Sequence, residues 1–122
     1  MEEIKEKKIL DLPLKKEWYM MIENGIKKEE YREIKPYWIK RLFKEQYSLT
    51  TKLNDSYIKS DFSEVKGKIF PTTFDAIRFR YGYTKRTMLF KLNEITIGQG
   101  KIEHGALPAT EVFILKLGNR IK

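Results

Sequence analysis

The sequence predicts an α+β fold, a small β-barrel of about five or six mostly antiparallel strands flanked by two or more helices. Two segments with helical periodicity lie in the first half of the chain, whereas most segments with strand-like alternation lie in the second half. The 122 residues suffice for one hydrophobic core. Since consecutive strands joined by short turns pair antiparallel, the late strands favour a barrel over a parallel sheet. We therefore expect one domain over residues 1–122.

The first strand and helix are expected near the N-terminus. Residues 9–14 form a short apolar run that suits a strand. The helix after it is predicted from apolar residues at i, i+4, i+7 and i+8, namely Leu14, Trp18, Met21 and Ile22. Asn24 and Gly25 are expected to end this helix, because glycine readily adopts the left-handed conformation of a helix C-terminus. Trp18 is expected in the core.

A second helix and a long polar segment follow. Proline is favoured in the first turn of a helix, so the second helix is expected to begin at Pro36. We expect its apolar residues Tyr37, Leu42 and Phe43 to be buried. Residues 46–73 lack periodicity and are rich in Ser, Thr, Asn, Asp and Lys, which predicts a polar loop or insertion.

From residue 77 onward the apolar pattern has a period of two, which is typical of strands. A hairpin is predicted with its turn at Gly82, and its inward residues are Ile77, Phe79, Tyr81, Met88, Phe90 and Leu92. The second strand of the hairpin is expected to continue to Ile97. A Gly-rich loop follows, and the apolar segment 111–121 predicts the last strand.

Composition limits the possible functions. The chain has 25 basic and 17 acidic residues, and its net charge of +8 favours polyanionic partners. It contains no cysteine and one histidine, His104, which argues against thiolate and histidine-cluster metal sites, and no cofactor is predicted. We expect His104 to be exposed in its loop. Since no apolar run approaches the roughly 20 residues of a membrane span, we expect no membrane contact and a cytoplasmic location.

The segment 27–34, KKEEYREI, is unusual because it would be polar on both faces if it formed a strand. One interpretation is an edge strand whose charges protect it from aggregation. The other is a strand whose residues line a binding cleft, since packing alone does not explain them. The sequence leaves both open.

Four residues in and before this segment, Gly25, Lys27, Glu30 and Arg32, match the pattern G-x-K-x-x-E-x-R. The pattern, its place after the first amphipathic helix and the order of elements resemble the ASCH domain, a family related to the PUA fold. The resemblance covers nearly the whole chain. It implies a small β-barrel in which the four residues line a cleft that binds RNA or a nucleotide.

The chemistry of these residues suits such a ligand. Lys27 is a point charge for a phosphate or carbonyl oxygen, and Arg32 offers a planar fork of donors. Glu30 and Arg32 lie two positions apart on one strand face, so we expect them to pair directly. Lys27 has the opposite parity, and it joins them only if it lies in the turn after Gly25 or if a bulge intervenes.

The predicted hairpin carries further candidate ligands for RNA. The basic residues interleaved there with Tyr81 and Tyr83 are Arg78, Arg80, Lys85 and Arg86. Basic and aromatic side chains together suit phosphate contacts and base stacking. The alternative is an ordinary solvated face of a hairpin.

Two other function classes stay open. Some proteins similar to ASCH domains are amidohydrolases that act on N4-acetylcytidine with a lysine, a threonine and a glutamate. The resemblance implies Lys27 as the lysine, with Glu30 or Glu103 transferring protons, but Glu30 stands at the position of the threonine, which favours binding over catalysis. The third class is a protein-interaction module in which residues 46–73 form the partner surface.

Overall fold

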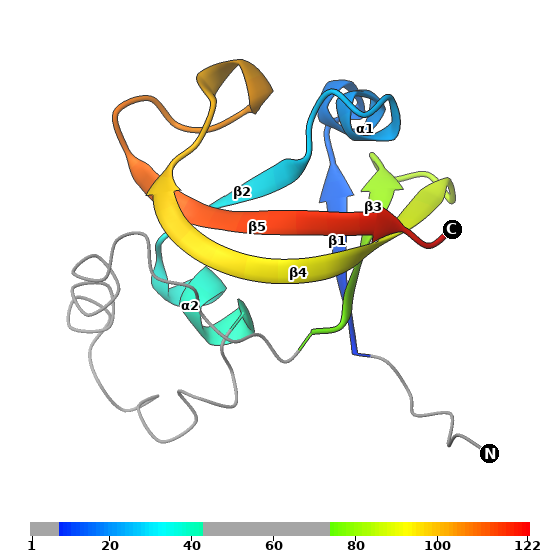
Figure 1. Ribbon diagram of the computed structural model, residues 1–122, viewed down its shortest axis with the longest axis horizontal. Coiled ribbons are helices and arrows are strands. Elements are labelled where there is room, and N and C mark those ends of the chain that lie inside the picture. The colour runs from blue at the N-terminus through cyan, green and yellow to red at the C-terminus, as the bar shows by residue number, and fades with distance from the viewer. Residues whose placement is uncertain (1–7, 43–73) are drawn as a thin grey trace.

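The computed structural model describes residues 8–42 and 74–122, which form a mixed five-stranded sheet curled into a half-barrel, with two α-helices (Figure 1). In chain order the elements are β1 (Ile9–Leu14), α1 (Lys16–Glu23), β2 (Glu29–Glu33), α2 (Pro36–Leu42), β3 (Ala76–Tyr81), β4 (Thr87–Gln99), the 3₁₀-helix η1 (Ile102–His104) and β5 (Glu111–Arg120). The polar loop predicted over 46–73 lies outside the described residues.

The strand order in the sheet is β1-β3-β4-β5-β2. β1 and β3 pair in parallel, whereas the other three neighbouring pairs are antiparallel. A parallel pair needs a long crossover connection, and here α1, β2 and α2 all lie between β1 and β3 in the chain. The predicted α+β barrel-like fold, with five mostly antiparallel strands and two helices, is confirmed at this level. Neither α-helix in the described ranges is long and apolar enough to cross a bilayer.

The hydrophobic core lies on the concave side of the curled sheet. The β3–β4 hairpin is confirmed, and Gly82 takes a positive φ of 61° in its turn. Its inward residues alternate as predicted, because successive strand residues point to opposite faces. The buried residues of this face are Ile77, Phe79, Met88, Phe90 and Leu92. β5 adds Phe113 and Leu115 to the same core.

The predicted buried faces of the two helices need correction. α1 buries Tyr19 and Ile22, while Trp18 is half-buried. Tyr19 packs edge-on against Tyr81 with ring centroids 5.1 Å apart, which rotates the helix by about one residue from the predicted face. In α2, the predicted burial of Leu42 is confirmed and Ile39 is also buried, whereas Tyr37 is 57% exposed. Phe43 lies outside the described residues. Two helix faces that differ by one residue have nearly the same apolar pattern in the sequence. Which of the two faces is buried is decided by the segment against which the helix packs.

The half-barrel has an open seam between its two edge strands, β1 and β2. α2 lies next to this seam, and Arg41 Nη2 donates a hydrogen bond to the backbone oxygen of Asp11 in β1 at 3.1 Å. A pocket of about 410 Å³ opens here, lined by Asp11, Leu12, Pro13, Arg32, Tyr37, Trp38 and Arg41. The fold therefore brings the segment after α1 to a gap in the barrel wall.

Candidate ligand-binding site

α1 ends in a turn that directs the next side chains into the molecule. Gly25 has φ of 78°, a left-handed conformation that strongly favours glycine. The backbone N–H groups of Ile26 and Lys27 both donate to the oxygen of Met21, at 2.9 and 3.0 Å. β2 begins only at Glu29. The expectation that Lys27 lies in the turn after Gly25 is confirmed, and strand parity does not apply to it.

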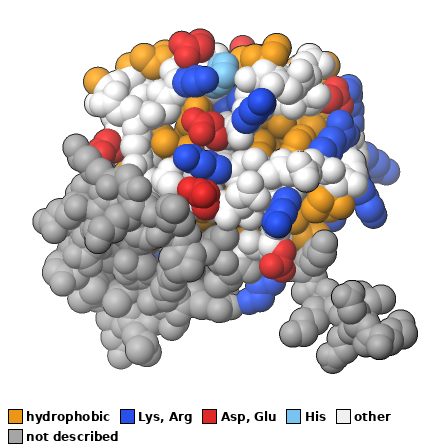
Figure 2. Space-filling model, in the orientation of Figure 1, with side chains coloured by type: hydrophobic (Ala, Val, Ile, Leu, Met, Phe, Trp, Pro, Cys, Tyr) orange, Lys and Arg blue, Asp and Glu red, His pale blue; other side chains and the backbone are white. Residues whose placement is uncertain are grey.

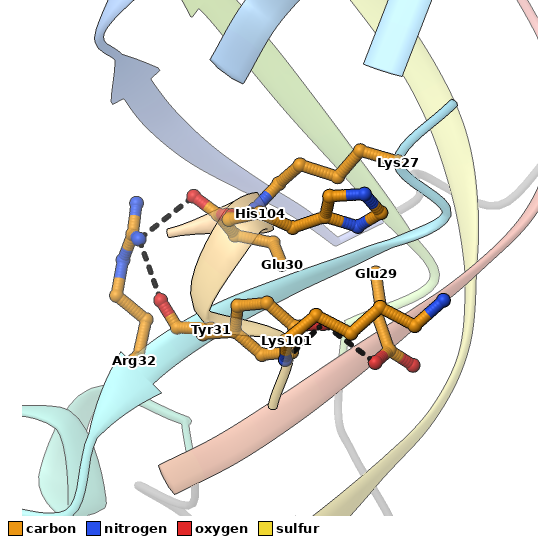
Figure 3. Close-up of polar contacts among 7 residues, drawn as sticks. All are labelled: Lys27, Glu29, Glu30, Tyr31, Arg32, Lys101 and His104. Carbon is orange, nitrogen blue, oxygen red and sulfur yellow. Dashed lines mark hydrogen bonds and ion pairs between the residues drawn. The ribbon is translucent and has the colours of Figure 1, made fainter. Parts of the chain in front are cut away.

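Lys27, Glu30 and Arg32 form one connected group, which we call the ionic triad (Figure 3). Glu30 bridges the two cations: its Oε1 lies 2.8 Å from Lys27 Nζ, and its Oε2 lies 2.8 Å from Arg32 Nη1. The exposed fraction is 1% for Lys27 and 3% for Glu30. The expected Glu30–Arg32 pair is confirmed, and it lies in a site largely closed to water, where ion pairs are screened least.

Aromatic rings and a backbone oxygen surround the buried ammonium group of Lys27. Nζ lies 4.7 Å from the ring centroid of Tyr31 and 5.4 Å from that of Trp18. It also donates a hydrogen bond to the backbone oxygen of His104. Together with Glu30 these contacts replace water around the ammonium. The prediction that His104 is exposed is wrong, because η1 packs over Lys27 and leaves the histidine only 9% exposed.

β2 combines features of both interpretations of the charged segment. Among the strands that the structure describes, it lies at an edge and pairs only with β5, as the protective-charge interpretation requires. However, Glu30 and Tyr31 are both buried although they point to opposite faces. Glu30 faces the ionic triad, while Tyr31 packs with Ala106, Val112 and Ile114. The charges are therefore internal on one face, and the strand is not simply solvated.

Tyr31 connects β2 to the loop that follows β4. Its hydroxyl donates to Glu29 Oε1 at 2.7 Å and accepts from the backbone N–H of Lys101 at 3.2 Å (Figure 3). Burial raises the pKa of Tyr31 well above its usual range. The Lys101 N–H lowers the pKa by less than burial raises it, and the Glu29 carboxylate raises it further. The neutral phenol is therefore strongly favoured in the folded state.

This shift predicts a loss of stability at alkaline pH. A raised folded-state pKa contributes stability that is complete below the unfolded pKa of about 10 and is lost as pH rises, because only the unfolded state releases the proton. Between about pH 10 and 11.5, the free energy of unfolding should fall more steeply in the parent than in Tyr31→Phe, by about 1.4 kcal/mol per pH unit. Urea denaturation across this range measures the difference. Parallel pH profiles would contradict the assignment.

Arg32 is the member of the ionic triad that reaches the surface, with 18% of its side chain exposed. Its Nη1 donates to both Glu30 Oε2 and the backbone oxygen of Tyr31, each at 2.8 Å. The guanidinium carbon lies 5.1 Å from the ring centroid of Trp38. Nε is buried without a hydrogen-bond partner among the described residues, and none of them bonds Nη2. Hydrogen bonds to described residues therefore fix the guanidinium at Nη1, whereas Nε and Nη2 make none.

Arg32 and Trp38 line two pockets. One is the seam pocket of about 410 Å³ next to β1. The other has a volume of about 290 Å³, and its lining residues are Tyr31, Arg32, Glu33, Lys35, Trp38, Gly105, Leu107 and Val112. We call these two cavities the Arg32 pockets. They place a fixed guanidinium beside aromatic surface, an arrangement suited to an anion attached to a planar group.

The basic hairpin residues lie apart from the ionic triad and have their own partners. Arg78 Nη1 lies 3.2 Å from Asp11 Oδ1, and Arg80 donates to the backbone oxygen of Thr84 at 3.1 Å. No hydrogen bond or ion pair joins either to the triad in the part of the chain that the structure describes. The hairpin and the motif therefore do not form one continuous site through these contacts.

Arg86 and Lys85 follow the turn of the hairpin, and both are exposed. Arg86 Nη2 lies 2.7 Å from Glu23 Oε1, and its guanidinium lies 4.9 Å from the Tyr81 ring centroid. The hydrogen bond to Glu23 raises the pKa of Arg86 above its ordinary value. Arg86 therefore fastens the hairpin to the end of α1, while Lys85 is a solvated side chain.

The geometry around Lys27 bears on the hydrolase alternative. Lys27 Nζ is occupied by Glu30 and by the His104 backbone oxygen, and the side chain is 1% exposed. Glu103 is exposed on η1. The structure thus brings Lys27 and Glu30 together but leaves Glu103 outside the pair. Nowhere within residues 8–42 and 74–122 do three or more His, Cys, Asp or Glu side chains gather in a way that could hold a metal ion.

Sequence reasoning predicted that the Gly-rich loop, with Lys101, Glu103 and His104, could close over the cleft, but it did not predict the close contacts of the loop's glycines. A Cβ atom at Gly100 would lie 2.5 Å from Tyr31 Cε1, and one at Gly105 would lie 3.1 Å from Trp18 Cε2. Glycines here allow the loop to press on two aromatic rings next to Lys27. The paired glycines were a usable signal, since glycine often marks the close approach of backbone to another group.

No protein-family model, curated protein or solved structure was found to match this chain.

Proposed function

We propose that this chain is an ASCH-type, PUA-like domain that binds RNA or a nucleotide, with Arg32 as its main contact to phosphate. The observation that carries the proposal is the orientation of Arg32. Glu30 and the Tyr31 backbone oxygen accept from Nη1, whereas none of the described residues bonds Nη2. A planar guanidinium that is fixed at Nη1 is pre-organised to donate from Nη2 to a phosphate oxygen.

The charge of the site favours an anion. The ionic triad has two cations and one carboxylate, so its formal charges sum to +1. In the linings of the Arg32 pockets, Lys35 is offset by Glu33 and Arg41 by Asp11, so each lining keeps the positive charge of Arg32. Glu30 carries one negative charge and cannot neutralise two cations. A phosphate next to Arg32 would balance the remaining charge.

Aromatic side chains next to Arg32 suit the base of such a ligand. Trp38 packs against the guanidinium, and Tyr37 meets Trp38 edge-to-face with ring centroids 4.9 Å apart. Tyr37 is 57% exposed on the wall of the seam pocket. Stacking of a base on an exposed aromatic ring contributes about 1–3 kcal/mol and tolerates any base. The proposed contacts therefore favour single-stranded RNA or a nucleotide with little sequence preference.

Substitution of Arg32 tests the proposal. Arg32→Ala should weaken the binding of a short single-stranded RNA by about tenfold or more and reduce the slope of log K against log salt concentration by about one, since a charge-assisted phosphate contact is lost. Lys91→Ala is the matched control, because Lys91 is an exposed basic residue on β4, outside the linings of these pockets. Fluorescence anisotropy over a range of salt concentrations measures both quantities. Equal affinity and slope for Arg32→Ala and Lys91→Ala would refute the proposal.

A further inference from the structure

A third pocket, of about 450 Å³, opens on another side of the turn that follows α1. Its lining residues are Ile22, Gly25, Lys27, Lys28, Phe90, Asn93, Leu117, Gly118, Asn119 and Arg120. It lies between the end of α1 and the neighbouring strands β4 and β5. Arg32 and Trp38 are absent from its lining, so it is separate from the Arg32 pockets.

The pocket coincides with an irregularity in the β4–β5 pairing. Phe90 pairs with Arg120 but Leu92 pairs with Leu117, so two steps along β4 match three along β5. From Leu92 to Glu94 the shift reverses, and two steps along β4 match one along β5. The extra residues fall at Gly118–Asn119 on β5 and at Asn93 on β4, and they line the pocket. We therefore call it the bulge pocket.

The two bulges interrupt the regular hydrogen-bond ladder between β4 and β5. Asn and Gly are both depleted in strands, and a glycine within a strand often marks a bulge or the close approach of a ligand. A Cβ atom at Gly118 would lie 2.5 Å from Asn93 Oδ1. The Asn93 amide can therefore occupy this position only because residue 118 has no side chain. Bulges are over-represented next to active sites, where they redirect side chains. Here they direct polar groups into a cavity.

The chemistry of the bulge pocket combines three kinds of group. Lys28 and Arg120 are exposed cations, and none of the lining residues has a carboxylate side chain. Arg120 Nε donates a hydrogen bond to the Lys122 backbone oxygen at 2.9 Å, whereas none of the described residues bonds Nη1 or Nη2. Glu23, which follows Ile22 in the chain, is already paired with Arg86 at 2.7 Å. Phe90 is an aromatic ring in the wall, 9% exposed. Figure 2 shows apolar side chains among lysines and arginines over this part of the surface.

The two asparagines supply the remaining specificity. Each carboxamide has one acceptor oxygen and two donor hydrogens, which together can match the edge of a nucleobase. Asn119 is exposed on β5, and Asn93 is exposed on β4 with its amide next to Gly118. Small-molecule sites typically have volumes of about 300–1,000 Å³, with apolar walls and a few convergent polar groups. A ligand with a planar base and one phosphate matches this pocket, because the phosphate suits the cations and the base suits the aromatic wall and the amides.

We propose that the bulge pocket binds a nucleoside monophosphate, with its phosphate on Lys28 and Arg120 and its base between Phe90 and the asparagine amides. The same chemistry could come from a free nucleotide or from the terminal nucleotide of an RNA with a 5′-phosphate. The inference rests on residues outside the ionic triad, except that Lys27 forms part of the wall. It therefore stands independently of the function proposed for Arg32.

Calorimetric titration with the four ribonucleoside 5′-monophosphates tests the inference. At least one should bind, and its nucleoside and inorganic phosphate should each bind at least tenfold more weakly, because each lacks one set of contacts. Arg120→Ala should weaken nucleotide binding by about tenfold through the lost phosphate contact. Gly118→Ala should weaken it through displacement of the Asn93 amide. Lys91→Ala should bind as the parent does.

The outcomes separate the two proposals. If no nucleotide binds at millimolar concentration, or if inorganic phosphate binds as tightly as the nucleotide, the bulge pocket assignment is overturned. If Arg32→Ala abolishes nucleotide binding while folded Arg120→Ala and Gly118→Ala retain it, this assignment is also overturned and the Arg32 proposal stands. Competition by an RNA with a 5′-phosphate, but not by the same RNA with a 5′-hydroxyl, would identify the terminal nucleotide as the source. Absence of that competition would identify the free nucleotide.

Discussion

Glu30→Gln is expected to lower the free energy of unfolding by about 3–5 kcal/mol, the usual cost of breaking a buried ion pair from one side. Glu30 is 3% exposed and is the carboxylate between two cations. The glutamine amide can still accept a hydrogen bond from Lys27, but the buried ammonium loses its counter-charge and keeps otherwise only a backbone oxygen and two aromatic rings. These groups do not neutralise a full charge. The substitution therefore raises the free energy of the folded state more than that of the unfolded state, in which water solvates Lys27. Urea denaturation at neutral pH measures the change.

A matched substitution and a double variant make the test specific. Glu33→Gln removes the same charge from an exposed position on β2 and should change the free energy by less than about 0.5 kcal/mol. Lys27→Met combined with Glu30→Gln should be more stable than the sum of the single variants implies, since neither charge is then buried alone. If Glu30→Gln behaves like Glu33→Gln, the buried pairing described for the ionic triad is wrong.

Gly100→Ala is expected to destabilise the fold by about 2–3 kcal/mol, although it adds one methyl group. The new Cβ would lie 2.5 Å from Tyr31 Cε1 and 2.8 Å from the Cβ of Ala106. Tyr31 cannot move easily because its hydroxyl is bonded to Glu29 and to the Lys101 backbone. The loop must therefore shift, and with it the His104 backbone oxygen that accepts from Lys27.

Gly98→Ala is the control for this variant. It lies near the end of β4, two residues away, and its added Cβ would meet Ile114 Cδ1 at 3.5 Å, an ordinary van der Waals contact. We expect its free energy of unfolding to stay within about 0.5 kcal/mol of the parent or to rise slightly, because alanine loses less entropy than glycine in a strand. Thermal denaturation monitored by circular dichroism compares the two. Equal midpoints would mean that Gly100 is not a close contact.

The structure places two candidate ligand surfaces around one buried group. The Arg32 pockets depend on the charge of the ionic triad, whereas the bulge pocket depends on the β4–β5 irregularity and includes Lys27 only as part of its wall. Lys27 therefore acts as an internal support, because its ammonium is paired with Glu30 and the His104 backbone oxygen and its side chain is 1% exposed. This arrangement explains how a basic motif can be largely buried while the neighbouring surface still attracts anions.

Several features followed from local sequence. The hairpin around Gly82, the start of α2 at Pro36 and the turn at Gly25 were all predicted, and the structure confirms them. Each depends on backbone preferences or on a short period of apolar residues, which act within a few positions of the chain. The Glu30–Arg32 pair was predicted for the same reason, since neighbours on a strand face are close in any fold.

Only the tertiary structure decided what surrounds these residues. The burial of Lys27 and His104 depends on a contact between two segments more than 70 positions apart in the chain. The bulge pocket depends on how Asn93 and Gly118 meet across two strands. The sequence by itself determined the elements and the charged motif, because propensity and periodicity are local. Which charges are buried, and which aromatic rings and amides face a cavity, depends on contacts between distant segments, and no local pattern encodes those contacts.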